Sequence, residues 1–332
     1  MKISVIIPVY NAERHVRSAL ESVLAGAGRL AAEDEAELVC VDDGSTDSSG
    51  RILDDFAARD ARVRVFHKPN GGEGSARNRG MDEAAGELLA FLDADDRMHP
   101  EALRVFCTLW RRARFDVLRY SARSVGDMAA AFLPLDGEPA CEPVDFARCG
   151  ESPFVFCALG WATVVTRELS RQVRWTDLRQ GADMVFVLDC LQKAKSTYRT
   201  KAELVNYYLD PNSISRRLSA GLLKGTCDYL PVVLAKADAL GIAPEISRAG
   251  SRFAAELLLR RMPGAWERLP SAEDRRSVEA AFWRSLGELS ERVGFLPGIV
   301  RTLVRQAVRR RSVAWLRLFV IVPWRITKRI AK

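Results

Sequence analysis

About the first hundred residues alternate short apolar runs with stretches of helical periodicity, and this alternation limits the possible folds more than any other feature of the sequence. The apolar runs cover residues 3–9, 37–41, 63–66 and 88–92, and helical stretches begin near residues 13, 46 and 75. Strands that alternate with helices in this way pair mainly in parallel, as successive βαβ units. We therefore expect an α/β domain with a mostly parallel sheet that is flanked by helices.

Polar residues follow three of the four apolar runs. Asn11 follows the first run, Asp42 and Asp43 follow the second, and a group of three aspartates follows the fourth. In sheets of this kind, ligands bind beyond the carboxyl ends of the strands. These side chains are therefore expected to share one crevice.

The aspartate group consists of Asp93, Asp95 and Asp96, directly after a run that is too apolar to be an exposed strand. Three carboxylates this close repel one another unless a cation or hydrogen-bond donors offset their charge. Oxygen ligands of this type suit Mg²⁺ or Mn²⁺, which can bridge the oxygens of a diphosphate. We expect a divalent-metal site here; an acidic surface turn is the alternative.

The second cluster is Asp42 and Asp43, followed by Gly44, Ser45 and Thr46. Asp42 or Asp43 could accept hydrogen bonds from a base or a ribose. Alternatively, the segment is a strand exit in which Ser45 or Thr46 caps the next helix. Both roles can coexist.

A glycine-rich loop, residues 70–75, opens the third helical stretch and is followed by Arg77. Backbone N–H groups and a guanidinium at such a place can bind phosphate. It is not a dinucleotide fingerprint, because Arg77 replaces the third glycine and the loop follows the third strand, not the first. We interpret Arg77 as a charge clamp on a diphosphate; the alternative is a surface helix residue.

These segments together resemble the inverting glycosyltransferases of family two, which have the GT-A fold. The resemblance covers about the first hundred residues, through the segments 6–11, 41–47, 76–80 and 84–96. It implies a nucleoside contact by Pro8, Tyr10 and Asp42 or Asp43, with Asn11 in the same donor site. It further implies that Arg77 lies near the nucleotide and that Asp93 and Asp95 hold the metal and the diphosphate.

Beyond residue 150, segment 160–167 resembles the acceptor side of the family, and segment 181–186 resembles the Glu-Asp motif that supplies the catalytic base. Ala182 stands where the family has Glu, so Asp183 is the expected base; in the alternative it only caps a helix. Trp161 suits either the core or a sugar-stacking platform. Residues 212–216 resemble the polar loop that ends family catalytic domains.

From about residue 216 the pattern is helical only, with prolines such as Pro231 expected to punctuate or delimit the helices. Two apolar faces are expected to pack: Leu223, Cys227, Leu230, Leu234 and Ala237 on one, and Val278, Phe282, Leu286 and Leu289 on the other. The expected division is a catalytic domain at 1–215, an all-helical extension at 216–297, and a basic amphipathic tail at 298–332.

The tail carries much of the positive charge of the chain. Residues 301–332 hold ten Arg or Lys and no Asp or Glu, so the rest of the chain has a net charge of −3 within a total of +7. This localisation argues against nucleic acid and for an anionic membrane surface. The apolar run 313–322 is too short to span a bilayer, and an interfacial helix is expected; packing of the apolar stripe against its own domain or a partner protein is the alternative.

The sequence thus predicts a metal-dependent inverting glycosyltransferase that moves a sugar from a nucleoside diphosphate, with UDP expected, to a hydroxyl acceptor. A saccharide or lipid-linked acceptor of cell-surface polysaccharide or glycolipid synthesis is expected. Because no secretory leader opens the sequence, we expect a cytoplasmic location at the inner face of the cell membrane. The alternatives are a catalytically silent sugar-nucleotide-binding module, motivated by Ala182, and a nucleotidyltransferase, which should have an N-terminal phosphate loop that is not found.

Overall fold

The computed structural model describes residues 1–135, 137–144, 160–178, 180–209, 219–239, 266–291, 304–306 and 308–309. Contacts between residues divide the chain into two compact units. Of the described residues, the first unit holds 1–135, 137–144, 160–177 and 186–209. The second unit holds 178, 180–185 and the described residues from 219 onward.

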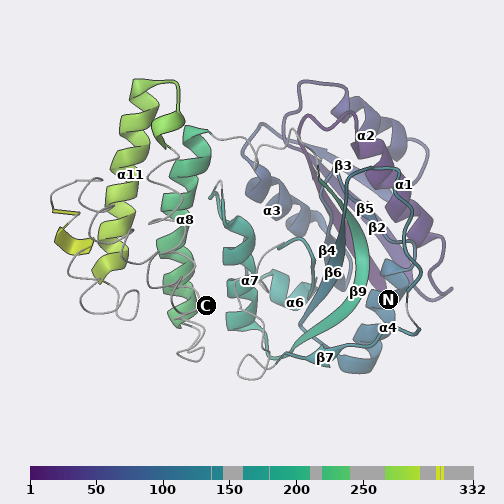
Figure 1. Cartoon of the computed structure of the whole chain (residues 1–332). Helices are drawn as coiled ribbons and strands as arrows, with labels where there is room; N and C mark the ends of the chain where they lie inside the picture. The colour runs from purple at the N-terminus through teal and green to yellow at the C-terminus, as the bar shows by residue number, and fades with distance from the viewer. Residues whose placement is uncertain are drawn as a thin grey trace. The chain divides into compact units, whose positions relative to one another are not determined.

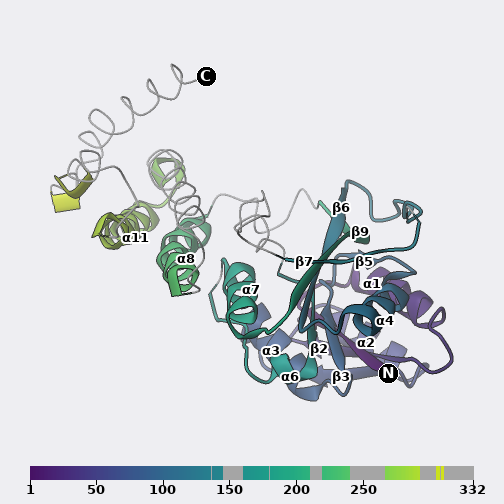
Figure 2. The same cartoon turned by 90° about the horizontal axis from the view of Figure 1, so that it is seen from below.

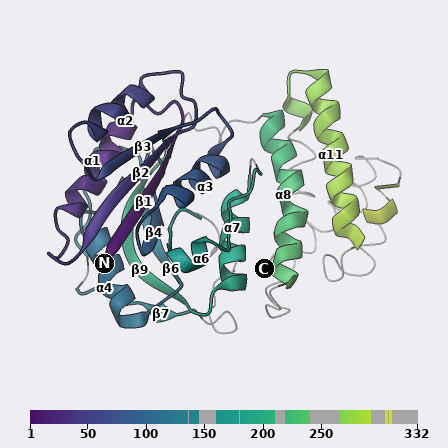
Figure 3. The ribbon, with the colours of Figure 1, turned by 180° about the vertical axis from the view of Figure 1, so that it is seen from behind.

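The first unit is built on a sheet whose first four strands confirm the predicted runs. These strands are β1 (Lys2–Val9), β2 (Glu35–Asp42), β3 (Val63–His67) and β4 (Leu88–Phe91), joined by α1 (Val16–Ala27), α2 (Ser49–Ala57) and α3 (Glu73–Glu83). They lie in the order β3-β2-β1-β4, and all three pairs are parallel, as Figure 3 shows from behind. The carboxyl ends of β1, β2 and β4 therefore meet at one edge.

Beyond β4 the sheet is mixed, whereas the sequence predicted a mostly parallel one. The further strands are β5 (Arg97–Met98), β6 (Val117–Val125), β7 (Glu142–Pro143), β8 (Thr163–Thr166) and β9 (Thr197–Tyr208). β8 lies antiparallel between β4 and β6, β9 pairs in parallel with β6, and β5 and β7 pair antiparallel with β9. The regular βαβ rhythm of the first hundred residues does not continue here, and strand direction is set by contacts between distant segments.

Helices cover both faces of this sheet. α1, α2 and α4 (Ala102–Ala113) lie on one face, and α3 and α6 (Arg167–Ser170) on the other (Figures 1 and 2). The crossovers from β1 to β2 and from β2 to β3 run in one direction across the sheet, and the crossover from β3 to β4 runs back. Right-handed connections then place α3 on the opposite face from α1 and α2. Because both faces are covered, β1 is buried from Ile3 onward.

Gly80 brings α3 against β1. A Cβ at Gly80 would overlap Cγ2 of Ile6, whose side chain is fully buried in β1. Only a residue without a side chain allows so close an approach between a helix and a strand. This contact fixes the height of α3 above the sheet, and with it the position of Arg77 one turn earlier in the helix.

In the second unit, α8 (Ala220–Ala239) and α11 (Ala272–Glu291) pack side by side, and the short helix η3 (Trp266–Arg268) contacts α11 (Figure 1). The predicted apolar faces are confirmed wherever side chains are described: the buried members are Leu223, Cys227, Leu230, Leu234, Val278, Phe282 and Leu286. Ala237 and Leu289 lie outside the described side chains.

Pro231 lies inside α8, so the prediction that it punctuates or delimits a helix was wrong. A proline inside a helix removes one backbone hydrogen bond. Here the buried face continues on both sides of the proline, through Leu230 before it and Val233 and Leu234 after it. Packing of this face against α11 accounts for the continuity of the helix.

Of the predicted tail, only residues 304–306 and 308–309 are described, and they are helical. Val304 is fully buried, and Cγ1 of Val308 approaches Gly287 of α11. This turn of the apolar stripe therefore packs within its own unit. The apolar run 313–322 lies outside the described residues. Among the helices that the structure does describe, none has the length and apolarity to cross a bilayer.

Candidate functional site

The three aspartates that follow β4 form one compact carboxylate cluster. Asp93, Asp95 and Asp96 each place a potential ligand atom within 4.8 Å of the others. Asp96 is fully buried, and its Oδ1 accepts a hydrogen bond of 2.8 Å from the backbone N–H of Tyr208 in β9. Its Oδ2 is buried without a hydrogen-bond partner among the described residues. The sequence-predicted acidic group is thus held together at the carboxyl edge of the sheet.

The electrostatics of this cluster suit a cation. Burial, reinforced by the charges of Asp93 and Asp95, raises the pKa of Asp96 to about 9. A divalent cation beside these oxygens would offset that repulsion and satisfy the buried oxygen of Asp96. Three carboxylates are a donor set that fits Mg²⁺ or Mn²⁺. The residues present therefore fit the expected metal.

Arg77 is bonded directly to this cluster. Its Nη2 lies 2.5 Å from Oδ1 of Asp93 and 2.6 Å from Oε1 of Glu73, and the side chain is only 1% exposed. The alternative of a surface helix residue is therefore wrong. A guanidinium buried next to an acidic cluster lowers the net negative charge of this edge of the sheet.

The ring of Trp175 packs against the guanidinium of Arg77. The sequence did not point to this residue. The Cζ of Arg77 lies 4.1 Å from the centre of the Trp175 ring. The same ring stacks on Phe186 at 4.0 Å with an interplanar angle of 7° and meets the edge of Phe91 at 5.3 Å. The side-chain amide of Asn78 holds the Trp175 backbone, with bonds of 2.9 Å to both its N–H and its carbonyl oxygen.

Asp43, at the end of β2, anchors the glycine-rich loop. Its Oδ1 accepts bonds from Nζ of Lys68 at 2.5 Å and from the N–H of Gly71 at 3.0 Å, and its Oδ2 accepts one from the N–H of Gly72 at 2.8 Å. Gly72 has φ of 87° and stands directly before α3. The loop N–H groups that were expected to bind phosphate are thus partly taken up by Asp43.

Asp42 forms a carboxylate–imidazole–carboxylate chain with His67 and Asp54. Oδ2 of Asp42 lies 2.8 Å from Nδ1 of His67, and Nε2 of His67 lies 3.0 Å from Oδ1 of Asp54. Oδ1 of Asp42 accepts the N–H of Ser45 at 2.9 Å. Sequence reasoning missed His67, because nothing in its own segment shows that two distant carboxylates converge on its ring.

The hydrogen bonds that join Asp42, His67 and Asp54 shift the pKa values of Asp42 and His67. Burial by itself would raise the pKa of Asp42, but hydrogen bonds from Ser45 and His67 outweigh it, and the net effect lowers the pKa. Hydrogen bonds to Asp42 and Asp54 raise the pKa of His67 above its ordinary value of 6.5. The two carboxylates therefore favour a charged imidazole of His67 beside Asp42.

The loops that follow β1 and β2 are tied together by Asn11. This residue has φ of 49°, and its Oδ1 accepts the N–H of Thr46 at 2.8 Å, while its own N–H donates to Oγ of Ser45 at 3.1 Å. The prediction that Ser45 or Thr46 caps α2 was wrong, because Ser48 is the residue directly before the helix. Both hydroxyl residues instead bond the first loop.

Tyr10 and Pro8 differ in accessibility. The Tyr10 side chain is 51% exposed, which leaves its ring free to contact a ligand. Pro8 is buried within β1 and lies beside Val41 of β2.

Trp161 is 2% exposed and its ring lies 5.7 Å from that of Tyr207, so its packing is that of a core residue.

Asp183 belongs to the second unit and is the second residue of α7 (Ala182–Lys193). Gly181 just before the helix has φ of 71°, and a Cβ there would meet the ring of Tyr229, so the entry into α7 is closely packed. A carboxylate in the first turn of a helix is electrostatically favourable whatever its role. The expected polar loop at 212–216 lies outside the described residues.

Comparison with known proteins places this arrangement in a family. The model of glycosyl transferase family 2 matches residues 4–146. The chain is 30% identical over 224 residues to the uncharacterized glycosyltransferase YibD of Escherichia coli, an alignment that covers 65% of this chain and 63% of that protein. It is also 30% identical to a putative teichuronic acid biosynthesis glycosyltransferase, TuaG, of Bacillus subtilis, over 64% of this chain and 81% of the relative.

Among solved structures, that of S. aureus TarS 1-349 in complex with UDP-GlcNAc has a TM-score of 0.69 with 20% identity, and the match covers 96% of this chain and 90% of that one. At that identity the likeness concerns the fold, and it confirms the expected GT-A-like architecture. The chain belongs to glycosyl transferase family 2. It spans less than two thirds of the length of YibD.

The contact of His67 with Asp42 predicts a measurable titration. In the native protein the His67 ring should titrate above 6.5, and Asp42→Asn should lower this pKa because the main hydrogen-bond acceptor loses its charge. The check is an NMR titration of the imidazole signals, with Asp55→Asn, an exposed neighbour in α2, as the control. A His67 pKa at or below 6.5 in the native protein would contradict the assignment.

The raised pKa of His67 also predicts how the free energy of unfolding depends on pH. A raised folded-state pKa stabilises the fold below the unfolded-state value, and this stabilisation is lost as pH rises through the folded-state value. The lowered pKa of Asp42 acts in the acid range instead, where stability is lost as pH falls through it. The part of the unfolding free energy that is lost as pH rises above 6.5, the ordinary histidine pKa, should therefore be missing in His67→Gln, as denaturant unfolding at a series of pH values would show.

Proposed function

We propose that this protein transfers a sugar from a nucleoside diphosphate, UDP being our choice of nucleotide, to a hydroxyl acceptor with inversion. The observation that carries the proposal is the carboxylate cluster at the end of β4, bonded to the buried guanidinium of Arg77. An acidic group and a fixed cation side by side suit a bound metal and a diphosphate, respectively. The UDP-GlcNAc complex of TarS, a protein of the same fold, supports a UDP-sugar donor.

On this proposal, Asp93, Asp95 and Asp96 hold Mg²⁺ or Mn²⁺. The cation, when bound, neutralises the charge that develops on the departing diphosphate. Arg77 contributes a second positive charge, which α3, Glu73 and Trp175 hold at a fixed place. A group that is already in position needs no reorganisation as the charge develops, which is the main source of electrostatic catalysis.

For the nucleoside we assign Tyr10 as a stacking surface, supported by its exposure, with Pro8 and Asn11 shaping the loop beside it. Of the two aspartates at the end of β2, we assign Asp42 to the base or ribose. Asp43 accepts bonds from Lys68 and from the N–H groups of Gly71 and Gly72, whereas Asp42 bonds Ser45 and His67. Asp43 then positions the loop before α3.

For the acceptor side we assign Asp183 as the base that removes the proton of the attacking hydroxyl. The support is its place in the family motif and its half-buried position in the first turn of α7. Ala182 in place of the family Glu motivates the competing proposal, a sugar-nucleotide-binding module without turnover. The nucleotidyltransferase alternative gains no support from the residues described above.

The acceptor we propose is a saccharide or a lipid-linked saccharide of cell-surface polysaccharide or glycolipid synthesis, supported by the relation to TuaG. We further propose that the chain works in the cytoplasm at the inner face of the membrane, with the basic tail as its contact. The packing of Val304 and Val308 limits the membrane-facing part to residues after this turn. No nucleic-acid partner is proposed.

Removal of one metal ligand tests the donor site. Asp95→Ala should weaken UDP binding in the presence of Mn²⁺ by at least about tenfold, equivalent to about 1.4 kcal/mol, because the bridge between protein and diphosphate is lost. The measurement is calorimetric titration with and without Mn²⁺, and circular dichroism confirms folding. Asp55→Ala, which removes an exposed carboxylate of α2, is the matched control. Equal Mn²⁺-dependent affinity in the folded variant would refute the metal assignment.

Replacement of the proposed base tests transfer separately from binding. Asp183→Asn should keep UDP affinity and lose turnover of a UDP-sugar by about 10²-fold or more, because an amide cannot accept the proton of the acceptor hydroxyl. The readout is UDP release over a panel of UDP-sugars, with Asp177→Asn, an exposed carboxylate, as the control. If the native chain binds UDP and hydrolyses or transfers none of the donors, the silent module is correct.

The tail is tested by co-flotation with vesicles. The full chain should float with anionic vesicles and less with neutral ones, and binding should fall as salt screens the charge of the tail. A chain that ends before Gly298 serves as the comparison. Equal flotation of the two chains would assign the tail to protein packing and not to lipid.

A further inference from the structure

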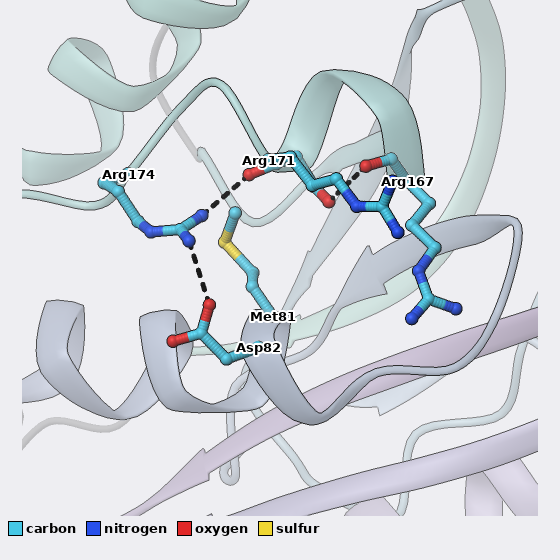
Figure 4. A pocket seen from close by; sticks show the side chains of 6 residues that line it. Met81, Asp82, Arg167, Arg171 and Arg174 are labelled. Carbon is cyan, nitrogen blue, oxygen red and sulfur yellow. Dashed lines mark hydrogen bonds and ion pairs between the residues drawn. The ribbon is translucent and has the colours of Figure 1, made fainter.

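A basic hollow lies between the last turn of α3 and the segment that contains α6 (Figure 4). Its volume is about 220 Å³, and its lining consists of Met81, Asp82, Arg167, Ser170, Arg171 and Arg174. Three guanidinium groups therefore come from eight consecutive residues, and a single carboxylate opposes them. The lining has a net charge of two positive units.

Two of the three arginines are held in place by hydrogen bonds to the protein. Arg174 donates from Nη2 to Oδ1 of Asp82 at 2.9 Å and from Nη1 to the carbonyl oxygen of Ser170 at 2.8 Å (Figure 4). Arg167 donates from Nη1 to the carbonyl oxygen of Ala85 at 2.7 Å. Each guanidinium has five N–H groups, so both retain donors for a ligand.

Arg171 differs from these two. Its side chain is exposed, and within the described part of the chain the guanidinium makes no hydrogen bond or ion pair. Nζ of Lys193 bonds to the carbonyl oxygen of Gln172, the residue after Arg171. Like charges gathered in this way repel one another unless an anion lies among them.

The hollow is distinct from the donor site. The N–H of Arg167 donates to the carbonyl oxygen of Glu87, the residue directly before β4, at 2.9 Å. The carboxylate cluster follows the other end of the same strand. The two sites therefore lie at opposite ends of β4, and the arginines of the hollow take no part in the chemistry proposed above.

We propose that this hollow binds a phosphate group, either of a soluble phosphate compound or of a phospholipid headgroup. One arginine fork is enough to pair with a planar carboxylate, whereas a tetrahedral phosphate can accept bonds from several guanidinium groups that approach from different sides. The arginines of the hollow suit a tetrahedral phosphate. Arg174 is held by its bond to Asp82 of α3, and Arg167 is held by its bond to the carbonyl oxygen of Ala85, just before β4. Arg171 lies between these two arginines in the sequence.

The test is a calorimetric titration of the full chain with inorganic phosphate in a phosphate-free buffer without metal. Saturable binding is expected, with at least tenfold weaker affinity in Arg171→Gln and none detectable in the double variant Arg167→Gln with Arg171→Gln. Arg59→Gln, an exposed arginine just after α2, is the matched control and should bind as the native chain does. Because Arg171 makes no described side-chain contact, its replacement should leave the fold intact.

Two further measurements make the outcome decisive. UDP binding with Mn²⁺ should be unchanged in all three variants, so failure of this proposal is distinguishable from failure of the donor site. Flotation on vesicles of phosphatidylcholine with and without phosphatidic acid identifies the source: a loss in the double variant assigns a lipid headgroup, and no loss, with phosphate binding abolished, assigns a soluble phosphate. Absence of saturable binding, or equal affinity in the native chain and Arg171→Gln, would overturn the proposal.

Discussion

The buried guanidinium of Arg77 is the interaction on which the donor edge of the first unit depends. A charge this deep is strongly unfavourable unless it is paired and hydrogen-bonded. Arg77 meets that requirement with Asp93 from the end of β4, Glu73 from its own helix and the ring of Trp175. One side chain thus joins the acidic cluster, α3 and the segment before α7. Loss of Asp93 or Glu73 would remove one of the two carboxylates that offset the charge of Arg77.

Three other polar side chains at this edge also make hydrogen bonds within the protein. Asp43 holds the loop before α3, Asn11 joins the loops after β1 and β2, and Asp42 is fixed by Ser45 and His67. Groups whose orientation is fixed by such bonds bind a ligand with little further loss of conformational freedom. The same bonds mean that replacement of these aspartates disturbs the loops as well as the contacts with a ligand.

The local parts of the fold could be predicted from the sequence, and the parts that depend on distant contacts could not. The strands from β1 to β4 and the aspartates after β4 follow from apolar runs and their polar ends. The antiparallel entry of β8 between β4 and β6 has no such signature, because strand direction is set by the whole sheet. The roles of Trp175 and His67 were missed for the same reason: their partners are far away in the chain.

The two hydrogen bonds between the Asn78 side chain and the Trp175 backbone can form only after the ribosome has added Trp175. The two residues are 97 positions apart, so at about 5–20 residues per second a ribosome needs about 5–20 s to add the ring on which Arg77 rests. The segment that matches the family model ends at residue 146, before this ring and before Phe186. During synthesis, the nascent chain therefore passes through a stage in which Arg77 and the aspartates after β4 have been made but the Trp175 ring that packs against Arg77 has not.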